Sequence, residues 1–281
     1  MDERRRRSVA FAHHEFFPSV FHIRDSMGVC MTLLAGTEHA ILVDTGYGLE
    51  DVAAYVRTLT DKPLDVLLTH GHHDHALGAQ WFRKVWLRKE DFPVYETYTN
   101  DHWRRHVLEG ARDKGLSVDE DAFLAAKMPA PEGLDEGEVD LGGLTVRVIA
   151  CPGHTPGSAV IYVPKYELLL TGDDWNPCTW LFFPEALCAQ DYRRNVRELL
   201  KLPFANVLCS HQEKLHSRVY LDRFMEYLTD DCLKAARTVN TGDSVGARTA
   251  EARLPLEQIF VFDRDKFEQR LGRGEKVESG E

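Results

Sequence analysis

The residues with the clearest chemical potential lie at positions 70–75, where four histidines and an aspartate occupy six consecutive positions. The stretch reads HGHHDH and follows an apolar run at 66–68. The whole chain has 13 histidines among 281 residues, so composition alone does not explain this density. Neutral imidazole and carboxylate groups are ligands of Zn²⁺ and other divalent ions. The cluster therefore predicts a metal site.

The spacing within this cluster favours more than one ion. His70 and His72 are two positions apart, so in an extended segment they point to the same side and can share an ion. Asp74 and His75 are adjacent, and they can face a second ion where the backbone turns into a helix. Two neighbouring ions are an arrangement used in hydrolysis. Because four ligands do not fill two sites, further ligands are expected downstream.

Three later segments supply such ligands, each at the end of an apolar run that is typical of a strand. They are His154 in Cys-Pro-Gly-His, Asp173 in Thr-Gly-Asp and His211 in Cys-Ser-His. A sheet that presents ligands from neighbouring strand ends holds them rigidly. We therefore expect these three residues to join the cluster at one sheet edge.

The elements that must position these residues alternate between strand and helix patterns, which favours a layered α/β or α+β class. Strands are expected at 29–34, 40–43, 65–68, 85–87, 144–149, 159–163, 167–170 and 206–209, and helices at 49–60, 76–83, 189–200 and 217–236. The run 258–262 is expected to close a sheet edge. Residues 95–128 predict a helical insertion. No Gly/Ser or Pro linker divides the chain, so a single domain over 1–281 is expected, with a C-terminal extension at 215–281.

Composition excludes some partners. The formal charge is −11, which argues against nucleic-acid binding, and the basic run at 4–7 is interpreted as a solvated tail. No apolar stretch approaches the ~18–20 residues of a membrane-spanning helix. The six cysteines are scattered, without a C-x-x-C pair or a signal-type segment, and predict reduced thiols in a cytoplasmic protein. Oligomeric state does not follow from these features.

The ordered pattern across residues 20 to 215 resembles the metallo-β-lactamase fold superfamily. The H-x-H-x-D-H motif is matched at 70–75, and the later ligands follow in the family's order. The resemblance implies an α+β fold, a four-layer αββα sandwich with metals at one edge of the paired sheets. It implies a first metal on His70, His72 and His154, and a second on Asp74, His75 and His211, with Asp173 bridging both.

The activity implied by the resemblance is that of a metal-dependent hydrolase. A metal-bridging hydroxide would cleave a small ester, thioester or lactone, with Asp74 as the catalytic residue that orients the water or moves its proton. Two divalent ions are implied; zinc is favoured, and the ligand chemistry leaves iron and manganese open. The expected partner is a small-molecule substrate, with no nucleic acid and no membrane. A mononuclear-iron dioxygenase, or another redox or non-catalytic use of the scaffold, remains the alternative.

The aspartate that is expected to bridge the two metals indicates which branches of the superfamily the chain resembles. Asp173 resembles the glyoxalase II and lactonase branches, because the true β-lactamases lack it. Gln212 follows the last histidine where glyoxalase II enzymes usually have glycine, so the broader hydrolase description is retained. Asp44 lies in a D-T-G match and is expected to orient a ligand histidine, with a simple turn aspartate as the alternative.

Several aromatic and histidine residues have an open role. Those that follow Asp173 either wall an apolar pocket or pack a loop onto the core: Trp175, Trp180, Phe182 and Phe183. His73 is interpreted as a non-ligand. His102 and His106, four positions apart, share one helix face and are interpreted as solvated, with substrate contact as the alternative.

Overall fold

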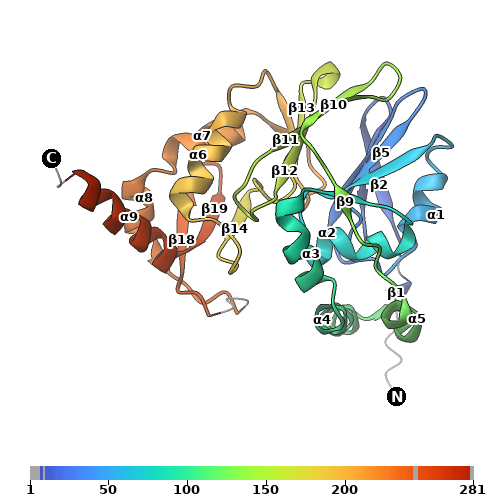
Figure 1. The fold of residues 1–281 in the computed structure, drawn as a ribbon, viewed down its shortest axis with the longest axis horizontal. Coiled ribbons are helices and arrows are strands. Elements are labelled where there is room, and N and C mark those ends of the chain that lie inside the picture. The colour runs from blue at the N-terminus through green and yellow to red at the C-terminus, as the bar shows by residue number, and fades with distance from the viewer. Residues whose placement is uncertain (1–6, 9, 243–245, 279–281) are drawn as a thin grey trace.

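Two large β-sheets form the centre of the fold (Figure 1). The computed structural model describes residues 7–8, 10–242 and 246–278. The first sheet has seven strands in spatial order: β2 (Ala12–Phe17), β3 (Val20–Arg24), β4 (Cys30–Ala35), β5 (Ala40–Val43), β6 (Leu64–Leu67), β7 (Trp86–Leu87) and β9 (Glu132–Gly133). The second has six: β10 (Gly137–Asp140), β11 (Thr145–Ala150), β12 (Ala159–Val163), β13 (Leu168–Leu170), β15 (Asn206–Leu208) and β16 (His216–Ser217).

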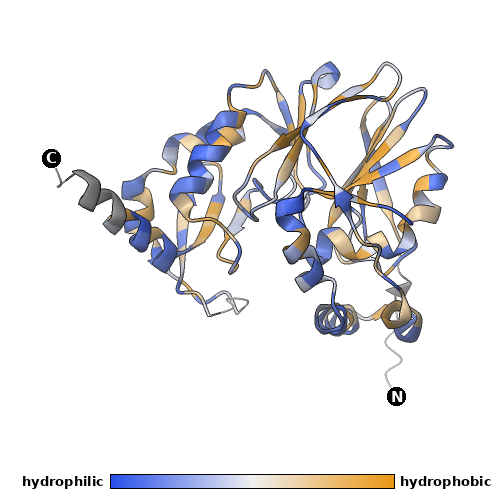
Figure 2. Ribbon diagram, in the orientation of Figure 1, coloured by the Kyte–Doolittle hydropathy of each residue, from blue (hydrophilic) through white to orange (hydrophobic). Residues whose placement is uncertain are grey.

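The two sheets pack face to face through a shared apolar core. Val43 and Leu67 of the first sheet belong to the same buried cluster as Ile161, Leu170 and Leu208 of the second. Figure 2 shows apolar residues concentrated on the strands of both sheets. Burying one such side chain contributes about 1.5–3 kcal/mol, so this core fixes the two sheets relative to each other.

Helices cover the outer face of each sheet. The first sheet is covered by α1 (Val52–Arg57), α2 (His73–Ala76) and the 3₁₀ turn η1 (Leu77–Trp81), which follow its strands. The second is covered by α6 (Ala189–Leu199) and α7 (Val219–Tyr227). Tyr192 of α6 and Phe224 of α7 are fully buried against that sheet. The result is a helix–sheet–sheet–helix arrangement, and the predicted α+β sandwich is confirmed.

A helical segment is inserted between β7 and β9 of the first sheet and lies beside the histidine cluster. After the 3₁₀ turn η2 (Lys89–Asp91) it contains α3 (Phe92–Tyr98), α4 (Asp101–Asp113) and α5 (Glu120–Ala125), and β8 (Leu116–Ser117) pairs with β1 (Arg7–Ser8). The Asn100 side chain caps α4 by accepting a hydrogen bond from the backbone N–H of Trp103. The buried Arg104 guanidinium donates to the Ala126 carbonyl at 2.6 Å, which fixes α4 against the end of α5. Most of the predicted basic tail, residues 4–6, lies outside the described residues.

The C-terminal part forms a separate four-stranded sheet that packs against α6 and α7. Its spatial order is β14 (Cys178–Leu181), β19 (Gln258–Asp263), β18 (Thr249–Leu254) and β17 (Arg237–Thr238), accompanied by α8 (Asp230–Ala235) and α9 (Arg264–Glu278). The expectation that 258–262 closes a sheet edge is wrong, because β19 is an inner strand with β14 and β18 on either side. Phe260 and Phe262 are fully buried, as an inner strand requires. No helix among the described residues is long and apolar enough to span a bilayer.

Candidate metal centre

The seven predicted ligands converge from the carboxyl ends of neighbouring strands. The loop after β6 carries His70 and His72, and the short helix α2 carries Asp74 and His75. The others follow β11, β13 and β15, and are His154, Asp173 and His211. Because β5 and β6 run parallel in one sheet and β13 and β15 in the other, these strand ends meet at one edge of the sandwich.

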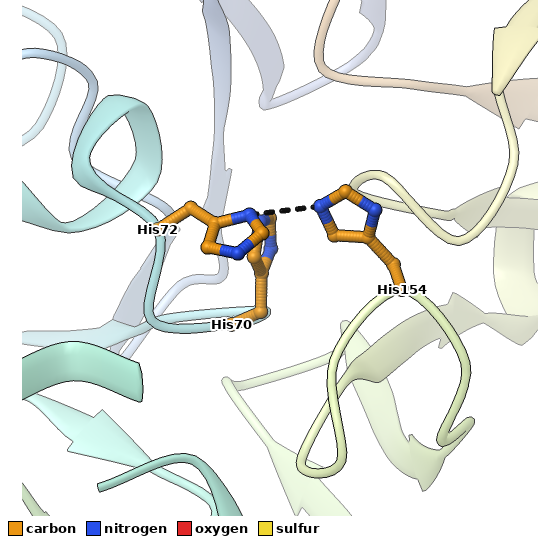
Figure 3. A group of neighbouring side chains, drawn as sticks. All are labelled: His70, His72 and His154. Carbon is orange, nitrogen blue, oxygen red and sulfur yellow. Dashed lines mark hydrogen bonds between the residues drawn. The ribbon is translucent and has the colours of Figure 1, made fainter. Parts of the chain in front are cut away.

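Three histidines form the first group of candidate ligands. The ligand atoms of His70, His72 and His154 lie within 4.8 Å of one another. Figure 3 shows His72 and His154 pointing toward each other from separate loops, with His72 Nδ1 2.9 Å from His154 Nε2. His70 Nε2 is buried and has no hydrogen-bond partner. An unsatisfied buried nitrogen is unfavourable by about 1–3 kcal/mol, and a bound cation would satisfy it.

The second group combines carboxylates with histidines: Asp74, His75, Asp173 and His211, whose ligand atoms also lie within 4.8 Å. His211 Nε2 lies 3.0 Å from Asp173 Oδ2, and the same oxygen is 3.7 Å from His154 Nε2 in the first group. Asp173 therefore lies between the groups. Its Oδ1 and the Nε2 of His75 are buried without a hydrogen-bond partner, 3.5 Å apart. These imidazole and carboxylate atoms fit a pair of divalent ions.

The two groups differ in charge. In the first, burial and neighbouring histidines hold the pKa of His70 well below its ordinary value, and burial lowers the pKa of His154 to about 4. Their imidazoles are therefore neutral, which is the form that binds metal. In the second, burial opposes protonation, but nearby carboxylates such as Asp173 raise the pKa of His75 and His211. The negative charge of these carboxylates favours a positive charge beside the two rings, which either ring protons or a bound cation would supply.

Asp44 orients one of the ligand histidines, as its D-T-G match predicts. Its carboxylate accepts hydrogen bonds from His75 Nδ1 at 2.9 Å and from the backbone N–H of Thr69 at 2.7 Å. Because Nδ1 of His75 donates to Asp44, its Nε2 carries the lone pair that faces the second group. The Asp44 backbone has a φ of 63°, a left-handed conformation that aspartate tolerates better than most residues.

Glu185 orients a second ligand histidine and was not found by sequence reasoning. Its carboxylate accepts hydrogen bonds from His72 Nε2 at 2.5 Å and from the hydroxyl of Tyr98. This leaves Nδ1 of His72 facing the first group. Lys266 at the start of α9 holds the Glu185 loop, because its Nζ donates to the carbonyls of Phe183 at 3.0 Å and Ala186 at 2.7 Å. In sequence Glu185 is a single acid 113 positions from His72, without a motif that could reveal it.

Asp91 joins two ligand loops and was also missed. The carboxylate is fully buried and accepts hydrogen bonds from the backbone N–H groups of Gly71 and Gly157, both at 2.7 Å, and from the Thr155 hydroxyl at 2.9 Å. Gly71 lies between His70 and His72, whereas Thr155 and Gly157 follow His154. A Cβ at Gly157 would lie 2.6 Å from Asp91 Cβ, so only glycine allows this approach.

A stability test arises from His22, a buried histidine of β3. Its Nε2 donates to the Gln212 carbonyl at 3.0 Å, and burial lowers its pKa to about 4. Because the folded-state pKa lies below the unfolded value, the unfolded chain gains the proton first. The free energy of unfolding should therefore fall by about 2–3 kcal/mol at this site between pH 7.5 and 4.5.

Urea unfolding at both pH values should show a smaller loss of stability for His22→Gln than for wild type. The exposed His14→Gln control should keep the wild-type loss, and an unchanged loss in His22→Gln would contradict the assignment.

A pocket of about 720 Å³ opens beside both groups of ligands. Trp180 and Phe183 line it, as one of the two interpretations expected. Trp175 and Phe182 do not belong to its lining and are fully buried in the core. The Trp175 Nε1 donates to Gln258 Oε1 at 3.1 Å, which fixes the ring against β19. Of the four aromatic residues after Asp173, two therefore pack in the core and two line the pocket.

The other histidines also have defined places. His73 lies outside both ligand groups and stacks on Trp103, with ring centroids 4.8 Å apart. His102 and His106 are exposed, in agreement with the solvated interpretation, and they line the pocket.

The fold and its family match agree on one superfamily. The family model described as "Metallo-beta-lactamase superfamily" matches residues 27–211, and the chain belongs to this superfamily. It is 29% identical over 141 residues to "Probable metallo-hydrolase YqgX" of Bacillus subtilis, covering 50% of this chain and 63% of that protein. It is 24% identical over 219 residues to "Acyl-coenzyme A thioesterase MBLAC2" of Gallus gallus, covering 68% of this chain and 76% of that protein. The chain thus spans less than two thirds of the bacterial relative.

Solved structures resemble the same fold. A metallo-beta-lactamase family protein from Thermus thermophilus aligns with a TM-score of 0.53 and 19% identity, covering 81% of each chain. The sec-alkylsulfatase Pisa1 from Pseudomonas sp. aligns with a TM-score of 0.59 and 17% identity, covering 77% of this chain and 41% of that one. At these identities the likeness concerns the fold alone.

Proposed function

We propose that the protein is a dinuclear metal-dependent hydrolase that cleaves a thioester, ester or lactone in a small molecule. The observation that carries this proposal is the set of buried ligand atoms without hydrogen-bond partners: His70 Nε2, His75 Nε2 and Asp173 Oδ1. They belong to two adjacent groups that share Asp173 as a neighbour. Family membership supports hydrolysis, and the name of the Gallus gallus relative supports a thioester among the three bonds.

The side chains have separate tasks in this proposal. His70, His72 and His154 would hold one ion, and Asp74, His75 and His211 the other, with Asp173 between them. When bound, two divalent ions supply an activated water and polarise a carbonyl. Asp74 lines the pocket, and its Oδ2 lies 3.6 Å from Nε2 of both His75 and His211. In this proposal its carboxylate would accept the proton that the water loses.

We propose zinc as the metal and the cytoplasm as the location. Neutral imidazole and carboxylate are established zinc ligands. All six cysteines are free thiols, which supports a reducing compartment.

Metal content and turnover test the proposal together. Protein purified without added metal should contain about two divalent ions per chain by elemental analysis. Chelation should abolish hydrolysis of a panel of thioesters, esters and lactones, and zinc should restore it. His70→Ala should lose bound metal, whereas the exposed His14→Ala should keep the wild-type content. A single iron per chain without turnover on any panel member would overturn the proposal in favour of redox chemistry.

A further inference from the structure

The pocket has aromatic walls on the side of the first ligand group. The ring of Tyr98, at the end of α3, lies 4.4 Å from the His72 ring, and the ring of Phe183, after β14, lies 4.8 Å from it on another element. Trp103 of α4 extends the first wall, with its ring 4.7 Å from that of Tyr98. Trp180 of β14 extends the second, at 6.4 Å from Phe183. The walls therefore come from the helical segment and from the C-terminal sheet.

The side chains that line the pocket disfavour a substrate whose bound part carries a carboxylate. None of the described residues that line it is lysine or arginine, and its acids are Asp74 and Asp173, both within the second ligand group. The remaining lining is neutral or histidine: Tyr47, Asn176, Cys178, Gln212, Gly242, His73, His102 and His106 with the aromatic walls and ligand histidines. A charged group buried without a partner is strongly disfavoured. Away from the two ligand groups, a carboxylate on the bound portion of a substrate would find no lysine or arginine among the described lining residues.

We propose that the space between these walls is an acyl-binding site for a bulky, uncharged, apolar acyl group. This inference rests on the proposed hydrolase function and names the half of the substrate that the pocket selects. A volume of about 720 Å³ is in the range of sites for drug-sized ligands, far larger than an acetyl group needs. In the reaction, water adds its oxygen to the acyl carbon, the bond from that carbon to sulfur or oxygen breaks, and the leaving group takes a proton. The acyl product is a carboxylic acid.

A series of thioesters with one constant leaving group measures the selectivity. S-acetyl, S-butanoyl, S-hexanoyl and S-succinyl N-acetylcysteamine differ only in the acyl group. The ratio kcat/KM should rise by roughly fourfold for each methylene that becomes buried. The succinyl compound has the same four-carbon chain as butanoyl, with a carboxylate in place of the terminal methyl, and should react at least about tenfold more slowly than butanoyl.

Two tryptophans decide whether the walls cause this selectivity. Trp103→Leu and Trp180→Leu should reduce the gain per methylene to less than about twofold. Trp103→Phe keeps a ring on Tyr98 and should restore most of the gain. Trp81→Leu is the matched control, because Trp81 is 42% exposed and lies outside the pocket lining. Thermal melting checks that each variant is folded.

A binding measurement separates this inference from the proposed function. Calorimetry with zinc-loaded protein should show hexanoate binding at least about tenfold more tightly than acetate, and Trp180→Leu should remove this difference. If no compound is hydrolysed, the proposed function fails, and the hexanoate measurement still decides the acyl site. Hydrolysis that is independent of chain length, preference for succinyl, or equal binding of hexanoate and acetate would overturn the inference.

Discussion

Asp91→Asn is expected to lower the free energy of unfolding by about 3 kcal/mol. The carboxylate accepts from the N–H groups of Gly71 and Gly157 and from the Thr155 hydroxyl. An amide has a single acceptor oxygen, so its NH₂ group must face at least one of these donors. Each buried donor left without a partner is unfavourable by about 1–3 kcal/mol, and hydrogen bonds to a charged acceptor lie at the upper end. This loss is a large part of the total stability of a typical domain.

Urea unfolding at neutral pH measures the effect of Asp91→Asn. The control is Asp61→Asn, the same chemical change at a side chain that is 89% exposed, and its expected effect is within about 0.5 kcal/mol. Because Asp91 joins the loops of His72 and His154, the variant should also bind metal more weakly in its folded form. Equal stability of the two variants would show that the Asp91 carboxylate does not stabilise the fold by joining these two loops.

Glu185→Gln is expected to weaken metal binding at the first ligand group by about 10–100-fold. Carboxylates that fix a ligand histidine typically have effects of this size. Glutamine keeps the size of the side chain, but its neutral amide is a weaker acceptor for His72 Nε2 than the carboxylate that now lies at 2.5 Å. Competition with a chelator measures the affinity. An unchanged affinity would contradict the orienting role.

Lys266→Met should weaken metal binding through Glu185, by a factor of about three to ten. Its Nζ holds the loop by carbonyl hydrogen bonds and does not touch the ligands. Introduced into the Glu185→Gln background, the same change should therefore add little. Lys201→Met, at a side chain that is 70% exposed, is the matched control. Full additivity of Lys266→Met and Glu185→Gln would mean that Lys266 acts on the site by another route.

The sequence allowed prediction of which candidate ligand residues lie together because their pattern is local. His70, His72, Asp74 and His75 lie within six positions, and each later ligand follows an apolar strand. A strand end is recognisable from the chain alone, and strand ends of one sheet edge lie close together. The structure brings these residues together as expected.

The supporting residues could not be predicted in this way. Asp91 and Glu185 are two acids among 45, and their partners are backbone groups or side chains far along the chain. Their burial depends on tertiary packing, which local pattern does not report. The same applies to the tryptophans after Asp173. Trp175 is held in the core by Gln258 from β19, whereas Trp180 lines the pocket, and nothing in their spacing distinguishes them.

The parallel pairing of β14 with β19 has a consequence for biosynthesis. Cys178 lies opposite Ile259, so one wall of the pocket has no neighbouring strand until about 80 further residues have been added. Chains fold from the N-terminus as they leave the ribosome, and pairings between distant segments form late. The hydrogen bonds from Lys266 to the Glu185 loop can form only after residue 266 has been synthesised. We therefore expect the carboxylate support of His72 to be complete only after the start of α9 has been made.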